Sequence, residues 1–395
     1  MGISKQINTY LEKSSWIRRM FEEGLKLKKE HGEERVFDLS LGNPDLPPPK
    51  KVREALLNIV ENYQPEWHRY MPNAGFPYVR EIMAKKVSVE HKINFSANDI
   101  IMTCGAAGAL NVIFKTILNP NEEVLFPAPY FVEYFFYIEN HQGRAVPVST
   151  KEDFTLDLEA FERHITPNTK AVLINSPNNP TGQIYSAEEI KRLSELLKRK
   201  SAEYGHPIYL ISDEPYRNLV FDEEEVPSIF KYYNDSFIAY SFSKELSLAG
   251  ERIGFIAVHP EMENKDKIID GLVLANRILG FVNAPALAQR IAAECAFAKV
   301  DVEIYKKRRD LLCSLLEEGG LEFVKPKGGF FIFPKTPIDD LKFCEILKEE
   351  LILAVPGRGF GLSNHIRLAF CVSEEIILKM RDNFLRACDR AKKLI

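Results

Sequence analysis

Between about residues 97 and 258, short runs rich in β-branched and aromatic residues alternate with helical stretches. Neighbouring parallel strands need a long crossover connection, and a helix is the usual one. The alternation therefore predicts an α/β domain with a mainly parallel sheet and helices on both of its faces. The strands that we expect are Asp99–Thr103, Glu123–Phe126, Arg144–Val148, Lys170–Asn175, Pro207–Ser212, Ser236–Ser241 and Arg252–Val258. Helices are expected at Ala106–Leu118 and Ser186–Tyr204.

A second, smaller unit is expected after this domain. The proline run at Leu46–Pro49 cannot be helical, and it separates an N-terminal helix, about Ser15–Glu30, from the rest of the chain. After residue 280 a long helical pattern, Ala284–Glu317, leads into a short α+β pattern. Its members are strands at Leu321–Val324, Phe330–Phe333 and Ile366–Phe370, a helix at Asp339–Glu350 and a last helix. We predict an N-terminal segment (1–45) that packs with the small domain, a large domain (46–283) and a small domain (284–395).

Charge and composition restrict the partners that we expect. The 52 Lys and Arg residues nearly balance the 56 Asp and Glu residues, and no basic block of the kind that binds nucleic acid occurs. No run reaches the ~18 apolar residues of a membrane helix, and the first residues lack a signal-peptide pattern. The six cysteines are scattered, as is usual in a reducing compartment. We expect a cytoplasmic protein with no metal centre and with neither nucleic acid nor membrane as partner.

Polar side chains follow three of the predicted strands. In open α/β sheets, ligands bind beyond the carboxyl ends of the strands, so these side chains are candidates for one site. They are Asn179 after the fourth strand, Asp213 and Tyr216 after the fifth, and Ser241, Ser243 and Lys244 at the end of the sixth.

Among these residues, Lys244 is the clearest candidate for a catalytic role. Burial of a lysine at a strand end favours its neutral amine, which is the form that attacks a carbonyl or an aldehyde. A solvated surface lysine is the ordinary alternative. The predicted neighbours, which include a carboxylate, an amide, a phenol and two hydroxyls, favour a functional role.

A turn of small residues follows the first predicted strand. Gly105, Ala106 and Ala107 begin the helix there, and backbone N–H groups at a helix N-terminus attract anions. Arg252, eight residues after Lys244, can supply a matching cation. A turn of this kind can also serve packing alone.

The segment Ser241-Phe-Ser-Lys244-Glu-Leu-Ser-Leu-Ala-Gly250-Glu-Arg252-Ile-Gly254 resembles the lysine signature of class I/II aminotransferases of pyridoxal-phosphate fold type I. The resemblance extends over nearly the whole chain. It implies a large domain with a mainly parallel central sheet flanked by helices, and a smaller α+β domain. It also implies that Lys244 holds pyridoxal 5'-phosphate as a Schiff base and that Ser241, Ser243 and Arg252 bind the phosphate.

Further matches occur in the order of the family. By resemblance, Asp213 keeps the pyridine nitrogen protonated, Tyr216 and Asn179 donate to the ring 3-oxygen, and Tyr130 stacks on the ring. Many relatives carry a Ser or Thr hydroxyl in the phosphate turn, whereas this chain has Ala106 and Ala107. Phosphate binding there is therefore expected to rely on backbone N–H groups.

The resemblance also implies a substrate site and a dimer. Arg367 resembles the arginine that binds the substrate α-carboxylate, with Gly42 and Asn43 beside it and Asn179 as a further contact. Tyr70 resembles the tyrosine that reaches the cofactor phosphate of the neighbouring subunit. A homodimer with shared active sites is therefore expected.

The activity that the resemblance implies is a ping-pong transfer of an amino group from an L-amino acid to a 2-oxo acid such as 2-oxoglutarate. In it, Lys244 moves the proton from the substrate Cα to C4′ of the cofactor. A carbon–sulfur β-lyase would use the same residues. A serine acyl-transferase would also contain the S-x-x-K pattern of Ser241–Lys244, but its companion K-T-G motif is absent, because Lys335-Thr336 is followed by Pro337.

The substrate is the least determined part of the prediction. Arg277 could bind a distal carboxylate, which favours aspartate or glutamate, or it could serve a domain interface. Trp16, Arg18 and Phe331 could instead line an apolar or mixed pocket. Aspartate with 2-oxoglutarate is the pair that we prefer.

Overall fold

The computed structural model describes residues 2–13 and 16–394, and the side chains of residues 2–11 and 23–394. Its central feature is a seven-stranded sheet in the order β2-β8-β7-β6-β5-β3-β4. Only β8 runs antiparallel to its neighbours, so the prediction of a mainly parallel sheet is confirmed. The strands are β2 (Ile100–Thr103), β3 (Glu123–Ala128), β4 (Arg144–Ser149), β5 (Thr169–Asn175), β6 (Tyr209–Asp213), β7 (Ser236–Ser241) and β8 (Gly254–Val258).

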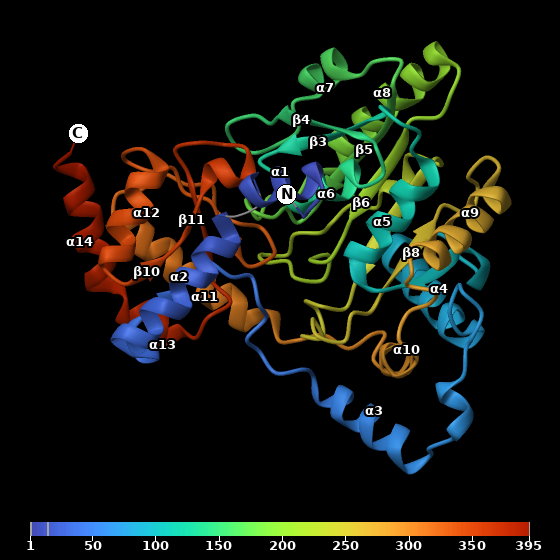
Figure 1. Ribbon diagram of the computed structural model, residues 1–395, viewed down its shortest axis with the longest axis horizontal. Coiled ribbons are helices and arrows are strands. Elements are labelled where there is room, and N and C mark those ends of the chain that lie inside the picture. Colours follow the sequence, from blue (N-terminus) through green and yellow to red (C-terminus); the bar gives the residue numbers. More distant parts are fainter. Residues whose placement is uncertain (1, 14–15, 395) are drawn as a thin grey trace.

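Helices cover both faces of this sheet (Figure 1). On one face, apolar side chains of α4, α7, α8 and α10 join the sheet in one core. On the other face, α5, α6 and α9 form a second core with it. Because both faces are covered, β2, β6, β7 and β8 are buried along their whole length. The helices up to this point are α1 (Lys5–Lys13), α2 (Trp16–His31), α3 (Lys50–Glu61), α4 (Pro77–His91), α5 (Gly105–Ile117), α6 (Glu133–Glu139), α7 (Leu158–His164), α8 (Ala187–Tyr204), α9 (Lys265–Ile278) and α10 (Ala286–Glu294).

A separate core lies under the C-terminal third of the chain. Two small sheets, β11-β12-β9 and β1-β10, lie beside it, and in the second the N-terminal strand pairs in parallel with a C-terminal one. The N-terminal segment is thus joined to the C-terminal part of the chain. The elements are β1 (Phe37–Asp38), β9 (Phe331–Ile332), β10 (Ile352–Leu353), β11 (Val355–Pro356), β12 (Ile366–Ala369), α11 (Val302–Glu318), α12 (Asp340–Glu349), α13 (Glu374–Lys379) and α14 (Arg381–Lys392).

Short 3-10 helices complete the description: η1 (Glu33–Arg35), η2 (Pro65–His68), η3 (Ala97–Asp99), η4 (Ile229–Lys231) and η5 (Gly357–Phe360). The helix α1 lies against α6 through the rings of Tyr10 and Phe136, whose centroids are 4.8 Å apart. Within the described ranges, no helix has the length and apolar content needed to cross a bilayer.

Two sequence predictions about the C-terminal part are wrong. The expected helix Ala284–Glu317 is two helices, α10 and α11, because Asp301 caps a new helix by accepting a hydrogen bond from the backbone N–H of Glu303. The expected strand Leu321–Val324 does not form. Its backbone has one hydrogen bond to a possible partner strand, from the N–H of Lys335 to the carbonyl oxygen of Glu322, and a single bond does not make a strand.

The three-part domain division stays a prediction. The packing of α10 bears on it, since Ala288, Ile291 and Ala292 belong to the core of the large sheet. We propose that the large domain continues through α10, and that its boundary lies near Asp301 and not at residue 283.

Candidate active site

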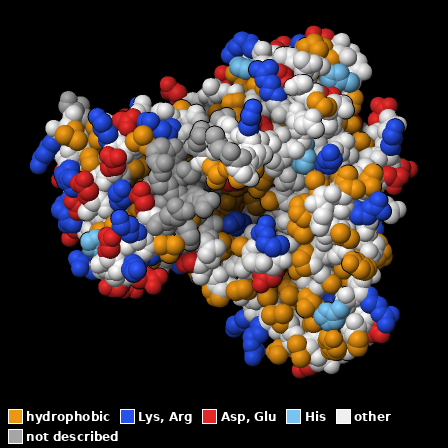
Figure 2. Space-filling model, in the orientation of Figure 1, with side chains coloured by type: hydrophobic (Ala, Val, Ile, Leu, Met, Phe, Trp, Pro, Cys, Tyr) orange, Lys and Arg blue, Asp and Glu red, His pale blue; other side chains and the backbone are white. Residues whose placement is uncertain are grey.

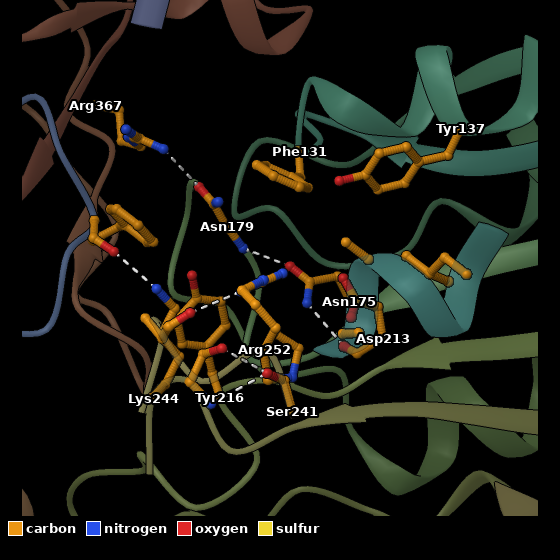
Figure 3. A pocket seen from close by; sticks show the side chains of 18 residues that line it. Phe131, Tyr137, Asn175, Asn179, Asp213, Tyr216, Ser241, Lys244, Arg252 and Arg367 are labelled. Carbon is orange, nitrogen blue, oxygen red and sulfur yellow. Dashed lines mark hydrogen bonds between the residues drawn. The ribbon is translucent and has the colours of Figure 1, made fainter. Parts of the chain in front are cut away.

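A cavity of about 340 Å³ lies beyond the carboxyl ends of β5, β6 and β7 (Figure 3). Ligands of open α/β sheets occupy this position. Most of the residues predicted from the sequence line it, although they come from distant parts of the chain. They are Gly42, Ala106, Ala107, Asn179, Asp213, Tyr216, Ser241, Ser243, Lys244, Arg252 and Arg367.

Lys244 follows β7 and lies at one side of the cavity. Its ammonium donates a 2.9 Å hydrogen bond to the carbonyl oxygen of Gly42 and lies 5.3 Å from the ring centre of Phe330. Burial lowers its pKa to about 8, and the nearby cations Arg367 and Arg252 act in the same direction. The neutral amine is therefore accessible close to neutral pH.

Asp213 ends β6 and is fully buried. Its Oδ2 accepts a 2.7 Å hydrogen bond from the hydroxyl of Tyr134, while its Oδ1 has no partner among the described residues. Burial raises the pKa of this carboxyl to about 7, and the bond from Tyr134 opposes that rise. A cationic N–H placed at Oδ1 would satisfy this atom and stabilise the carboxylate.

A chain of amide contacts connects Asp213 to the other side of the cavity. The side chain of Asn175 donates to the backbone oxygen of Asp213 at 2.8 Å, and its own oxygen accepts from the backbone N–H of Asn179 at 2.7 Å. The side-chain oxygen of Asn179 accepts from Arg367 at 3.1 Å. This orients the Asn179 side chain between the two ends of the site (Figure 3).

Arg367, on β12, is a buried cation without a carboxylate partner among the described residues. It donates to the carbonyl oxygen of Ser40 at 2.6 Å, and its Nε has no hydrogen-bond partner in the part of the chain that the structure describes. The guanidinium lies 4.4 Å from the ring centre of Phe331 and 4.7 Å from that of Phe360. Burial lowers its pKa to about 10, so it stays charged at neutral pH. Such a group is suited to bind an incoming carboxylate.

The opposite end of the cavity is suited to an anion. The hydroxyl of Ser241 donates to that of Ser243 at 2.8 Å, and both lie near the first turn of α5, where Ala106 and Ala107 have N–H groups free of helical partners. Gly105 supports the turn without lining the cavity. A Cβ there would lie 3.2 Å from Nη2 of Arg252, so glycine lets the guanidinium approach the turn.

The prediction for Tyr130 is wrong as to position. Its ring packs on Phe126 and against Gly361, whereas the next residue, Phe131, lines the cavity. Figure 3 shows the Phe131 ring on one wall of the site. Adjacent residues of a turn point in different directions, and the sequence does not say which of two aromatic rings faces inward.

Two other predicted residues lie outside the cavity. Asn43 is exposed beside Gly42, and Tyr70 is 93% exposed in the segment after η2. The side chains of Trp16 and Arg18 fall outside the described part of the chain. Arg277 is exposed near the end of α9 and does not line the cavity, whereas Phe331 does.

The sequence did not indicate Tyr134 or Tyr137, both on α6. Tyr134 holds Asp213, and Tyr137 lines the cavity (Figure 3). Their segment, Glu133-Tyr-Phe-Phe-Tyr-Ile-Glu, is aromatic on every side of the helix, so no periodicity distinguishes core tyrosines from those at the site.

Comparisons with known proteins identify the family. The family model described as "Aminotransferase class I and II" matches residues 34–382. This chain belongs to that family. It is an aminotransferase, and the family depends on pyridoxal phosphate.

Individual relatives are also aminotransferases by name. A probable aspartate/prephenate aminotransferase of Aquifex aeolicus is 33% identical over 87% of this chain and 89% of its own length. The aspartate/prephenate aminotransferase of Thermus thermophilus is 32% identical over 89% and 91%.

Solved structures show the same fold. An amino transferase from Eubacterium rectale has a TM-score of 0.95 and 38% identity over 99% of both chains. The aspartate aminotransferase of Thermus thermophilus with maleate has a TM-score of 0.87 and 30% identity over 98% of this chain and 100% of that one. The fold type I expectation is therefore confirmed.

The cavity fits pyridoxal phosphate. The unpaired Oδ1 of Asp213 matches a protonated ring nitrogen, the turn beside Arg252 and Ser241 matches a phosphate, and the amine of Lys244 matches an aldehyde. The family membership also sets aside the serine acyl-transferase alternative, and the names of the relatives favour amino transfer over carbon–sulfur lysis.

Proposed function

We propose that this aminotransferase holds pyridoxal phosphate on Lys244 and moves the amino group of an L-amino acid, with aspartate as first candidate, to 2-oxoglutarate. The observation that carries the proposal is the position of two cations at one cavity. Lys244 and Arg367 both line it, and neither has a carboxylate partner among the described residues. One can bind the cofactor and the other the substrate carboxylate.

Each residue has a definite role in this proposal. Bound pyridoxal phosphate supplies an aldehyde that takes up the amino group and a ring that withdraws electron density from Cα. Asp213 binds the ring nitrogen through Oδ1, and Tyr216 and Asn179 donate to the ring oxygen. Arg367 would bind the α-carboxylate as a planar fork and thereby direct the substrate amine toward the cofactor held on Lys244.

Lys244 is the group that moves the proton. With pyridoxal phosphate bound and the substrate amine joined to it, the neutral amine of Lys244 would be the base that takes the proton from Cα, and the resulting ammonium would return that proton to C4′. The lowered pKa supports this role, because an amine with a pKa of about 8 is largely unprotonated in mildly alkaline solution. Phe131 and Phe331 line the cavity and restrict water around the reacting atoms.

Two findings support a dicarboxylic substrate. The relatives from Aquifex and Thermus are called aspartate or aspartate/prephenate aminotransferases, and the Thermus enzyme was solved with maleate, a dicarboxylate. Arg277 lies outside the cavity of its own chain, so we propose that it serves the site of a neighbouring chain. Its neighbour Asn276 donates to Asn73 O at 3.2 Å, which places the end of α9 beside the segment that carries Tyr70.

A homodimer with shared sites is part of the proposal. Tyr70 is exposed and does not line the cavity of its own chain, and apolar side chains are also exposed on α3, α9 and α10 and in the segment after α3. Figure 2 shows apolar side chains gathered over the part of the surface that α3, α4 and α10 form in Figure 1. Exposed apolar patches of this kind commonly mark subunit contacts. The members are Leu56, Leu57, Val60, Tyr63, Leu274, Ile278 and Leu287.

We further propose a cytoplasmic location, which the free state of all six cysteines supports.

The substrate proposal is tested with a panel of amino donors. Aspartate, glutamate, alanine and phenylalanine are compared with 2-oxoglutarate as acceptor, using the wild type and Arg277→Ala. We expect the highest kcat/KM for aspartate and a selective loss for aspartate in the variant. An unchanged preference removes Arg277 from specificity, and keto-acid-independent release of pyruvate from cystathionine would make the enzyme a lyase.

A further inference from the structure

A buried lysine lies directly beneath the segment that carries Lys244. Lys86, on α4, is 2% exposed, and its ammonium is 3.1 Å from a carboxylate oxygen of Glu245, the residue after Lys244. It also lies 5.2 Å from the ring centre of Tyr240 and 5.9 Å from that of Phe242. Lys86 thus contacts the chain on both sides of Lys244.

Lys86 is held as a cation. Glu90, one helical turn along α4, contributes a second carboxylate at 2.8 Å. Burial by itself lowers the pKa of Lys86, but the carboxylates of Glu245 and Glu90 outweigh it and raise that pKa above the ordinary value. Apolar side chains of similar size can replace a buried ion pair without loss of stability. Packing alone therefore gives no reason for a buried charge at this place.

Asn218 connects the Lys86–Glu245 ion pair to the turn that carries Tyr216. Its side-chain amide donates to Glu245, to Tyr240 at 2.9 Å and to Glu90 at 3.0 Å. Asn218 belongs to the turn after β6 that also carries Tyr216. One cluster, formed by the buried Lys86, Tyr240 and Glu245 and the partly buried Glu90 and Asn218, thus joins α4 to the ends of β6 and β7, two of the three strand ends at the cavity.

The backbone at Glu245 has one further anchor. Its carbonyl oxygen accepts a 2.8 Å hydrogen bond from the N–H of Val300, in the segment between α10 and α11. The side chain of Glu245 is buried and does not line the cavity, and its hydrogen-bond and ion-pair partners among the described residues all belong to the cluster. The ion pair with Lys86 therefore adds a side-chain anchor to a turn that is otherwise held by backbone hydrogen bonds.

We propose that Lys86 is a positioning residue for Lys244, which through its ion pair with Glu245 holds the lysine amine where it can bond to the cofactor aldehyde. The proposal rests on the proposed role of Lys244. It assigns Lys86 no contact with cofactor or substrate. A displaced turn weakens the covalent capture of the aldehyde and leaves the ring and phosphate contacts of Asp213 and Arg252 in place.

The test compares two forms of the cofactor on the full-length chain. Pyridoxal phosphate has the aldehyde that Lys244 captures, whereas pyridoxamine phosphate has an amine and makes no bond to it. For Lys86→Met, we expect the dissociation constant of pyridoxal phosphate to rise about ten-fold, because small displacements strongly affect covalent steps. That of pyridoxamine phosphate should change less than about two-fold, and Lys86→Arg should restore most of the difference.

Lys265→Met is the matched control. It removes a cation that lies 2.7 Å from the buried carboxylate of Asp99, far along the sheet from Lys244, so it should lower thermal stability and leave both dissociation constants unchanged. Glu245→Gln tests the same pair from its other side if Lys86→Met does not fold. Equal weakening of both cofactor forms, or none, would overturn the proposal. A wild type that binds both forms equally and shows no imine absorbance would overturn the role of Lys244 itself.

Discussion

The hydroxyl of Tyr134 donates a 2.7 Å hydrogen bond to Oδ2 of Asp213, and Oδ1 of the same carboxylate faces the site without a partner among the described residues. Both residues are buried. One oxygen is thus fixed by the protein, and the other is left for the ring nitrogen of the cofactor. The bond also stabilises the charged form of a carboxyl whose pKa burial has raised to about 7.

The first prediction removes this bond. Tyr134→Phe keeps the ring contacts with Phe126 and Phe131 but loses the hydroxyl. We expect the affinity for pyridoxal phosphate to fall about ten-fold, since a lost hydrogen bond to a charged group costs about 1.5 kcal/mol or more. Titration of cofactor binding by absorbance measures the effect. Tyr209→Phe, in the same core, is the control and should bind the cofactor like the wild type.

The second prediction concerns the substrate carboxylate. Arg367→Lys keeps the charge but loses the planar fork, so kcat/KM for amino acids should fall roughly 30-fold, or about 2 kcal/mol. Amine donors that lack an α-carboxylate should react equally well with the variant and the wild type. If the variant lost activity toward both kinds of donor to the same extent, Arg367 would have a structural role.

Much of this site could be predicted because strand ends are visible in the sequence. The run Ser236–Ser241 was expected to be a strand and is one over the same residues. Its apolar stretch gives way directly to the polar residues of the site. The positions of Lys244 and Asp213 at one sheet edge then follow from the rule for open α/β sheets.

What could not be predicted depends on tertiary packing. Tyr130 and Phe131 are both aromatic, and only the fold shows that Phe131 faces the cavity. Lys86 has the sequence context of a surface lysine on a helix, and its burial follows from the docking of α4 under the turn at Glu245. Contacts between segments so far apart leave no local signal in a single sequence.

The third prediction is a pH dependence. Capture of the aldehyde requires the neutral amine, and burial lowers the pKa of Lys244 from the ordinary 10.5 to about 8. The rate at which the cofactor-free enzyme forms its imine absorbance should therefore rise with pH, reach half of its maximum near pH 8 and level off about one pH unit higher. Arg367→Gln removes a cation that lowers this pKa, so its midpoint should shift upward. A rate that still climbs above about pH 9.5 in the wild type would contradict the burial effect.

The fourth prediction addresses the shared sites. Lys244→Ala and Tyr70→Ala should each be poorly active alone. In a mixed dimer, however, one site receives its lysine and its tyrosine from intact copies. An equal mixture should recover roughly one quarter of wild-type activity, because half of the dimers are mixed and each has one complete site. No recovery after subunit exchange, or a monomer in sedimentation, would contradict a shared site.

The central claim is that Lys244, among all the lysines of the chain, holds the cofactor. Reduction of the holoenzyme with borohydride followed by peptide mass spectrometry tests it most directly, because reduction turns the imine into a stable bond at the residue that formed it. The account predicts the added pyridoxyl phosphate mass on the peptide that contains Lys244. The added mass on another lysine would contradict it.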